Sequence, residues 1–235
     1  MAFEEGAGTG TAGRRAHLPR LVALVDLDAA VGEGGTGIAA ALLDDLEEAA
    51  LAYARLSIRE LGEKDAPPCP AFARPEGRRT GRETAGAPVA QAVPDGRTGR
   101  PDALVVAFSA DGAGDLAEKL AAMALERLAP LPGSRVYGVC VAAGGDPSPA
   151  RRALGRLERR CSDQGLLWSG GLGIAGSEAL GPAMRTARMG LRRRYASEAL
   201  DELICVLRSG TDAGILEARP GIAARALGIL DRHRG

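Results

Sequence analysis

Hydrophobic residues gather along the chain in short runs that are separated by longer segments with helical periodicity. Four runs are apolar and cover residues 20–26, 102–108, 135–142 and 166–168. The first three also contain β-branched valines, as is typical of strands buried on both faces of a sheet. Residues 54–59 alternate between polar and apolar positions, which predicts a fifth, less buried strand at a sheet edge. The pattern therefore predicts five strands.

Helical periodicity fills most of the intervals between these strands. Thr36, Asp111 and Ser148 each precede a segment in which apolar residues recur at three- and four-residue steps, and each is suited to a helix start. The residues expected on the buried faces of the three helices are Ile38, Leu42, Leu43, Leu46 and Ala50, then Leu116, Leu120, Met123 and Leu128, then Ala150, Leu154, Leu157 and Cys161. A last long helix is expected to end at residues 209–210, after an irregular or short helical insertion at 177–190, and residues 222–230 are expected to add a final turn or helix.

The alternation of strands and helices predicts an α/β fold with a parallel sheet covered on both faces. We expect residues 1–19 to form a flexible tail and residues 20–235 to form one domain. Residues 62–101 are rich in Pro, Gly and Arg and are expected to be a long insertion or lid without regular elements. Residues 27–35 and the glycine-rich residues 169–176 are expected to be loops that follow strands.

Composition narrows the class of protein. The chain has 235 residues and a mass of 24.1 kDa, with 46% hydrophobic but only 3% aromatic residues, which predicts a core built from Ala, Leu and Val. Thirty basic residues balance thirty acidic ones, so no overall charge favours nucleic acid or an anionic membrane. The chain shows no apolar run long enough for a membrane span, and we expect a cytoplasmic protein.

The residues that most often hold metals are sparse. The four cysteines are not closely paired and are expected to be free thiols, with Cys69 alone in the long insertion. His17 and His233 lie in the expected tails. The sequence therefore predicts no metal site.

One segment resembles a known family. Val136-Tyr-Gly-Val139, a Gly-Gly turn, a helix that ends in Cys161 and then Gly165-Leu-Leu-Trp-Ser-Gly-Gly-Leu-Gly-Ile174 resemble the flavodoxin-like NAD(P)H-dependent FMN reductases and their iron–sulfur flavoprotein relatives. The resemblance is clearest over residues 101–210. It implies a flavodoxin-like three-layer sandwich with a five-stranded parallel sheet of order 2-1-3-4-5. The single cysteine of the insertion does not support an all-cysteine iron–sulfur cluster.

The resemblance also implies a cofactor site. In a sheet of this order ligands bind beyond the carboxyl ends of the strands, between the first and third strands. The loop after the first strand would bind the FMN phosphate, and the loops after the third and fourth strands would flank the isoalloxazine ring. The residues implied are Gly32, Gly34, Gly35, Thr36 and Gly37 in the first loop, Ser109, Ala110, Asp111 and Gly112 in the second, and Gly144, Gly145 and Asp146 in the third.

The function implied is that of an FMN-binding oxidoreductase. It would pass electrons from NAD(P)H through the flavin to a small acceptor such as a quinone or free flavin. No side chain is assigned as a catalytic acid or base. The family's habit also suggests a homodimer, in which the arginine face of the helix at 148–161 would meet the acidic face around Asp44 of a second copy.

Two alternatives stay open because the first loop departs from the family pattern. Asp26, Asp28 and Glu33 place negative charge where a phosphate dianion would bind. A cofactor-free flavodoxin-like domain, used for dimerisation or partner binding, is the first alternative. A Mg²⁺-dependent phosphotransferase that uses Asp26 and Asp28 is the second. Glycines that open a pocket would favour flavin, whereas carboxylates that fill it would favour the cofactor-free domain.

Overall fold

The part of the chain that the structure describes folds around a parallel sheet of six strands. The computed structural model describes residues 18–30, 37–62, 70–74, 100–110, 130, 132–222 and 224. In chain order the elements are β1 (Leu21–Asp26), α1 (Leu27–Ala30), α2 (Ile38–Leu61), β2 (Ala71–Ala73), β3 (Ala103–Ser109), β4 (Arg135–Ala142), α4 (Ser148–Asp163), β5 (Leu167–Ala175), α5 (Ser177–Ala183), α6 (Arg194–Ser209) and β6 (Ile215–Ala218). The strand order is β2-β1-β3-β4-β5-β6, and every neighbouring pair is parallel.

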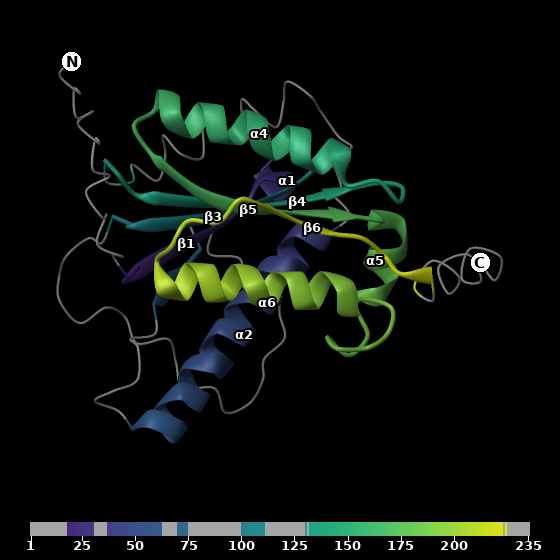
Figure 1. The fold of residues 1–235 in the computed structure, drawn as a ribbon, viewed down its shortest axis with the longest axis horizontal. Helices are drawn as coiled ribbons and strands as arrows, with labels where there is room; N and C mark the ends of the chain where they lie inside the picture. Colours follow the sequence, from purple (N-terminus) through teal and green to yellow (C-terminus); the bar gives the residue numbers. More distant parts are fainter. Residues whose placement is uncertain are drawn as a thin grey trace, which may run out of the picture.

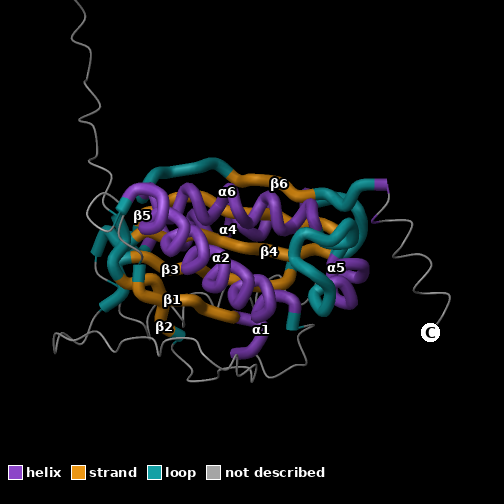
Figure 2. Tube along the Cα trace, turned by 90° about the horizontal axis from the view of Figure 1, so that it is seen from below, coloured by secondary structure: helices purple, strands orange, loops and turns teal. Residues whose placement is uncertain are grey.

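Helices cover both faces of the sheet, which confirms the predicted α/β class. Figure 1 shows α4 on one face and α2 and α6 on the other, and Figure 2 shows β2 and β6 at opposite edges. Alternate residues of β3 divide between the two sides: Val105 packs with α2 and α6, whereas Leu104 and Val106 pack with α4. The predicted inward residues of α2 and α4 are all buried. Those expected at 116–128 lie outside the described residues.

Asp102, directly before β3, joins the amino ends of β1 and β3. Its carboxylate accepts the backbone N–H groups of Arg20 and Leu21, with N–O distances of 2.9–3.1 Å. Nearby, the hydroxyl of Ser134 donates to the carbonyl of Pro101 at 2.9 Å. These side chains occupy backbone groups that lie before the strand ladders begin, so β1, β3 and β4 start in register.

The glycine-rich segment after Trp168 belongs to a strand and not to a loop, which corrects the expectation for residues 169–176. β5 runs through it to Ala175. Gly138 and Gly171 are partners in neighbouring strands, and the indole of Trp168 lies across both, 2.8–3.3 Å from where their Cβ atoms would be. Leu154 of α4 closes the same space. The glycines therefore make room for one large side chain between the sheet and α4.

A register shift in the β4–β5 pairing accompanies this packing. The shift falls between Val136 and Tyr137, which face Trp168 and Gly170 respectively, so Ser169 is the extra residue. The backbone N–H of Ala213 donates to the Ser169 carbonyl at 2.7 Å. Gly170 has a φ of +136°, and a Cβ atom there would lie 2.7 Å from the Ala213 carbonyl oxygen. The segment before β6 thus lies against the bulge.

A buried arginine, Arg135, links the bulge at Ser169 to the segment before β6. Arg135 is 8% exposed, and its guanidinium donates to the Ser169 hydroxyl at 2.9 Å and pairs with Asp212. The nearby Tyr137 is fully buried, and burial raises the pKa of its phenol. The Arg135 guanidinium therefore has one buried partner, Ser169, and one exposed partner, Asp212.

Four further expectations about strands and loops were wrong. Residues 54–59 continue α2 and do not form a strand, because no Gly or Pro interrupts the helix from Ile38 to Leu61. The edge strand is β2, which lies in the segment expected to have no regular element. β6 was not expected and adds a sixth strand beyond β5. The segment expected to be a loop after β1 begins as the single turn α1.

Three other elements agree closely with the sequence. β4 has the predicted bounds, α5 is the short helix expected within 177–190, and α6 ends at Ser209 before Gly210, which has a φ of +59°. Ser148 is the first residue of α4 and not its cap, because Pro147 holds the N-cap position. Most of the expected last helix at 222–230 lies outside the described residues. The same is true of residues 1–17 of the expected tail at 1–19.

Candidate functional site at the strand carboxyl ends

The candidate site is the edge of the sheet where β1, β3 and β4 end. The chain leaves β1 toward β2 on one side and returns to β3 on the other, so β1 and β3 form the point at which the strand order reverses. Open α/β sheets bind ligands at such a point. Figure 1 shows α5 just beyond the carboxyl ends of the central strands. Side chains of α1 and α5 are thus near enough to reach this edge.

Half of the twelve residues implied as cofactor ligands are described, and they lie in all three loops. Gly37 precedes α2, Ser109 and Ala110 end β3, and Gly144, Gly145 and Asp146 follow β4. The other six lie outside the described residues: Gly32, Gly34, Gly35, Thr36, Asp111 and Gly112.

Gly37 has the conformation of a loop that enters a helix. Its φ is +65°, no atom lies within 4 Å of where its Cβ would be, and its carbonyl accepts the N–H of Ala41 at 3.0 Å. The first turn of α2 contains no acidic residue. The start of this helix therefore keeps the positive end of its dipole.

The end of β3 is closed by Asp28, and Asp26 in turn binds the backbone of Asp28. The Asp26 carboxylate accepts the N–H of Asp28 at 3.0 Å, and the Asp28 carboxylate accepts the N–H of Ser109 at 2.9 Å. Both aspartates are half-buried. The N–H of Ala110 donates to the Val141 carbonyl at 2.7 Å. Both backbone donors of the described β3 loop are thus engaged within the chain.

The turn after β4 is closed by a glutamate. Gly144 has a φ of +69°, and its N–H lies 3.0 and 3.1 Å from the two carboxylate oxygens of Glu178. Glu178 comes from the first turn of α5. Its charge also reaches Tyr195, whose pKa is raised to about 12 by burial and, to a smaller extent, by Glu178. The Tyr195 hydroxyl donates to the Ala175 carbonyl at 3.1 Å, which ties α6 to the end of β5.

Asp146 serves the start of α4. Its carboxylate accepts the backbone N–H of Ser148 at 3.0 Å and the Ser148 hydroxyl at 2.8 Å. The backbone hydrogen bond, followed by that of the hydroxyl, lowers the pKa of Asp146. Asp146 precedes the N-cap residue Pro147, and its carboxylate accepts the first N–H of the helix, which has no partner within α4.

At the described ends of β3 and β4, the chain's own carboxylates occupy backbone donors that FMN could otherwise use. A flavin ring needs donors for its carbonyl and nitrogen acceptors, and the phosphate needs donors and positive charge. The N–H groups of Ser109 and Gly144 already bind carboxylates of the chain, and Asp26, Asp28 and Glu178 bring negative charge to the same edge.

The phosphotransferase alternative gains no support from the geometry. Each of the two aspartates uses Oδ1 to accept a backbone N–H, from Asp28 and Ser109 respectively. Among the described residues, no group of three or more His, Cys, Asp or Glu side chains is arranged to hold a metal ion. The proposal that Asp26 and Asp28 bind Mg²⁺ stays a prediction.

Glu178 was missed by the sequence analysis. The available signal was an acidic residue in the first turn of a short helix that follows Gly176. That position is common for solvated acids, and only the fold brings α5 next to the β4 turn. Trp168, by contrast, is part of the packing under α4 and does not reach this edge.

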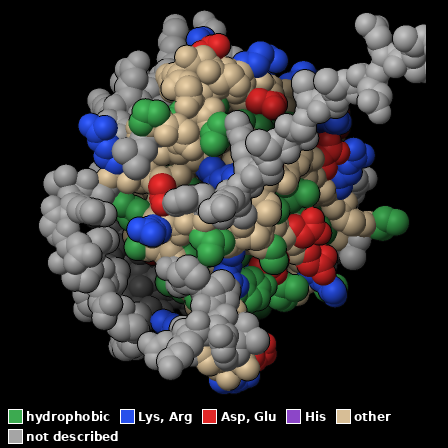
Figure 3. Space-filling model, turned by 60° about the vertical axis from the view of Figure 1, so that its left-hand side comes forward, with side chains coloured by type: hydrophobic (Ala, Val, Ile, Leu, Met, Phe, Trp, Pro, Cys, Tyr) green, Lys and Arg blue, Asp and Glu red, His purple; other side chains and the backbone are tan. Residues whose placement is uncertain are grey.

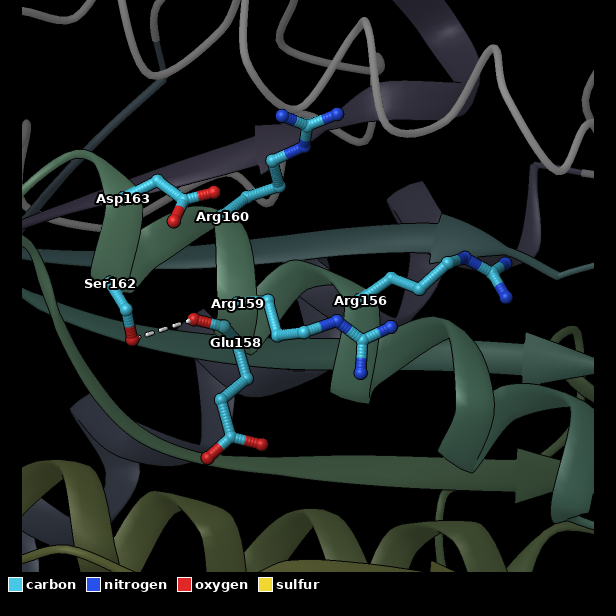
Figure 4. Close-up of a pocket in the computed structure, with 6 residues that line it drawn as sticks. All are labelled: Arg156, Glu158, Arg159, Arg160, Ser162 and Asp163. Atoms are coloured by element: carbon cyan, nitrogen blue, oxygen red, sulfur yellow. Dashed lines mark hydrogen bonds between the residues drawn. The ribbon is translucent and has the colours of Figure 1, made fainter.

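A shallow depression on α4 lies elsewhere. Figure 4 shows its lining, which comes from one helix: Arg156, Glu158, Arg159, Arg160, Ser162 and Asp163. The Ser162 hydroxyl donates to the Glu158 carbonyl at 3.2 Å. These residues form the second half of α4, whereas the candidate edge lies at the start of this helix. The depression is therefore separate from the candidate edge.

In the predicted homodimer, the α4 arginines of one copy would pair with the acidic face of α2 in the other, but two of those acidic residues already have partners within their own chain. Asp44 pairs with Arg74 at 2.6 Å, and Asp45 pairs with the buried Arg193, both within the same chain. On the face drawn in Figure 3, basic and acidic side chains are interspersed. The homodimer stays a prediction.

The cysteines in the described residues are free thiols. Cys140 and Cys161 are buried and Cys205 is exposed. Burial raises the pKa of Cys161 to about 12, so this thiol remains protonated and inert at neutral pH. Cys69 lies outside the described residues.

Comparisons with protein families, with curated proteins and with solved structures give no match to this chain. Within the described residues, no helix is both long and apolar enough to cross a membrane. The argument for function consequently depends on the topology and on the strand-end geometry.

Proposed function

We propose that the chain is a divergent flavodoxin-like domain related to the NAD(P)H-dependent FMN reductases. The strand order supports this, because β2-β1-β3-β4-β5 is the 2-1-3-4-5 order of that fold and β6 is added at its outer edge. The Gly-Gly turn after β4 and the paired glycines that receive Trp168 lie in the segment that carries the resemblance.

The function that the geometry supports best is that of a cofactor-free interaction domain. One observation carries the proposal: Asp28 and Glu178 occupy the backbone donors of Ser109 and Gly144 that an FMN ring would use. A ligand must displace these carboxylates and then tolerate their charge. Charge-assisted hydrogen bonds are the stronger kind, so the chain's own carboxylates compete well. The domain would retain the fold for dimerisation or for binding another partner.

FMN-dependent oxidoreduction, with NAD(P)H as the electron donor and a quinone or free flavin as the acceptor, stays a prediction. The absorption spectrum of the purified protein and a titration with FMN test both this prediction and the cofactor-free proposal. We expect purified protein to be colourless and to leave the fluorescence of added FMN unchanged at moderate salt. Flavin absorption bands in the purified protein, or saturable quenching of FMN, would contradict the cofactor-free proposal. NAD(P)H oxidation with quinone acceptors would then be the assay to run.

The positive part of the proposal is tested by molar mass. Light scattering across a range of protein concentrations separates a monomer of 24.1 kDa from a dimer of twice that mass. A dimer would support a domain that pairs with itself. A monomer at every concentration would remove self-association and leave a different partner.

A further inference from the structure

We infer that Asp28 and Glu178 act as internal ligands that exclude flavin from the strand-end edge, Asp28 permanently and Glu178 as a displaceable latch. The inference rests on the proposed function and names the residues that would enforce it. It predicts that flavin binding can be restored by changing two carboxylates.

The two contacts differ in exposure. The hydrogen bond from Ser109 to Asp28 is part-buried, so breaking it would leave a donor with little access to water. The hydrogen bond from Gly144 to Glu178 is exposed, and both ends can be solvated when it opens. Asp28 is therefore a fixed part of the edge, whereas Glu178 can leave.

The space around Gly144 suits this latch. No atom lies within 4 Å of where a Cβ of Gly144 would be, so the Cβ side of the turn is open, and the hydrogen bond from its N–H to Glu178 is itself exposed to solvent. When Glu178 leaves, a carbonyl or phosphate oxygen of a ligand can take its place on the Gly144 N–H. The carboxylate thus holds the site that an external oxygen acceptor would use.

The test combines substitutions that separate charge from occupancy. Asp28→Asn removes the charge but leaves a side-chain oxygen for Ser109. Glu178→Gln does the same for Gly144, and Glu178→Ala frees the N–H. Glu158→Gln on the exposed face of α4 is the matched control for loss of one negative charge. Each protein is titrated with FMN and with riboflavin, which lacks the phosphate.

We expect the double variant Asp28→Asn/Glu178→Ala to bind FMN at least about ten-fold more tightly than the unchanged chain, since each freed or neutralised group removes a charge-assisted competitor. Glu178→Ala is expected to improve riboflavin binding more than Glu178→Gln, because only the alanine variant frees the N–H. Glu158→Gln is expected to match the unchanged chain.

A direct readout follows the amide itself. In ¹⁵N-labelled protein, the Gly144 amide proton is expected to exchange faster with solvent in Glu178→Ala than in the unchanged chain, and added FMN is expected to slow that exchange again in the double variant. If the Gly144 amide exchanges at the same rate in Glu178→Ala as in the unchanged chain, the role of Glu178 as a latch is overturned.

The outcomes for the inference and for the proposed function are separate. If the unchanged chain binds FMN, the cofactor-free proposal fails, and the inference then stands or falls on whether the double variant binds more tightly. If the unchanged chain does not bind FMN and a double variant with unaltered circular dichroism does not bind either flavin, the inference is overturned while the cofactor-free proposal survives.

Discussion

Arg193 is the most deeply buried charged side chain in the described part of the molecule. It is 3% exposed, donates to the Met184 carbonyl at 2.9 Å and pairs with Asp45 of α2. The arginine thereby joins the segment before α6 to α2. A buried charge of this kind is tolerated because its partners replace the water that it loses.

Replacing Arg193 with alanine is expected to lower the free energy of unfolding by about 3 kcal/mol or more, because Asp45 and the Met184 carbonyl then lose their partner inside the protein. Urea unfolding measures the change. The neighbouring Arg194, which forms an exposed pair with Glu198, gives the control Arg194→Ala, for which we expect no measurable loss. Equal effects of the two substitutions would refute the role assigned to Arg193.

At the residue scale, the sequence predicted which residues lie at the candidate edge better than it predicted which side chains contact them. Gly144, Asp146 and Ser109 lie at the edge where they were expected. What closes them could not be predicted, because Asp28 meets Ser109 across 81 positions of the chain and Glu178 meets Gly144 across 34. Such contacts arise from the fold and leave no local pattern.

At the scale of elements, β5 shows how a strand can resemble a loop. Glycines usually weaken strands, yet here Gly171 accommodates the Trp168 ring. A Cβ atom added to Gly173 would lie 3.4 Å from the Cβ of Ala150 in α4, so this glycine also lets the helix lie close to the strand. α2 shows the reverse case. The alternation at residues 54–59 falls in its last turns, where few side chains are buried and the helical period is faint. β2 and β6, with three and four residues, are too short to show a pattern.

Gly170→Ala is expected to destabilise the protein by about 1–3 kcal/mol, because the residue has a φ of +136° and its new Cβ would meet the Ala213 carbonyl. Gly155→Ala is the matched control. Gly155 lies inside α4 with no atom within 4 Å of its Cβ position, so alanine there is expected to stabilise by up to about 1 kcal/mol. Thermal unfolding of both variants gives the signs, and two changes of the same sign would contradict this account of β5.

At the scale of the whole molecule, buried tyrosines link stability to alkaline pH. Burial raises the pKa of Tyr137 and raises that of Tyr195 to about 12. In the unfolded chain a tyrosine ionises near its ordinary value of 10.0, while the folded protein keeps these phenols protonated. The unfolded state therefore binds fewer protons above that pH, and stability is lost as the pH rises.

We expect the free energy of unfolding to fall between about pH 10 and 12, with a contribution from Tyr195 on the order of 1–3 kcal/mol. Tyr195→Phe removes the ionising group and is expected to flatten the fall, although it also removes the hydrogen bond to Ala175. Urea unfolding at several pH values compares the slopes. Parallel slopes for the two proteins would show that Tyr195 does not contribute.

The class of the fold could be predicted from the sequence because it depends on many residues at once. Four central strands and the faces of α2 and α4 were recognisable, since each repeats one physical preference over a whole element. The edges of the sheet and the closure of the candidate site each depend on a few residues. A feature that depends on a few residues leaves no repeated pattern in the sequence, so it could not be predicted from the sequence alone.

The extra residue at Ser169 has a consequence for how the gene can change. Trp168 faces α4 and Leu172 faces α2 and α6, with the one bulge residue between them. Deleting the Ser169 codon would place Trp168 and Leu172 three positions apart, so Leu172 and Ile174 would keep their layer in a strand without a bulge. The protein would lose the hydroxyl that Arg135 binds and the carbonyl that accepts the N–H of Ala213. A strand of the present length keeps both layers only with the bulge, whereas an insertion of one residue after Gly170 would turn Leu172 and Ile174 toward α4.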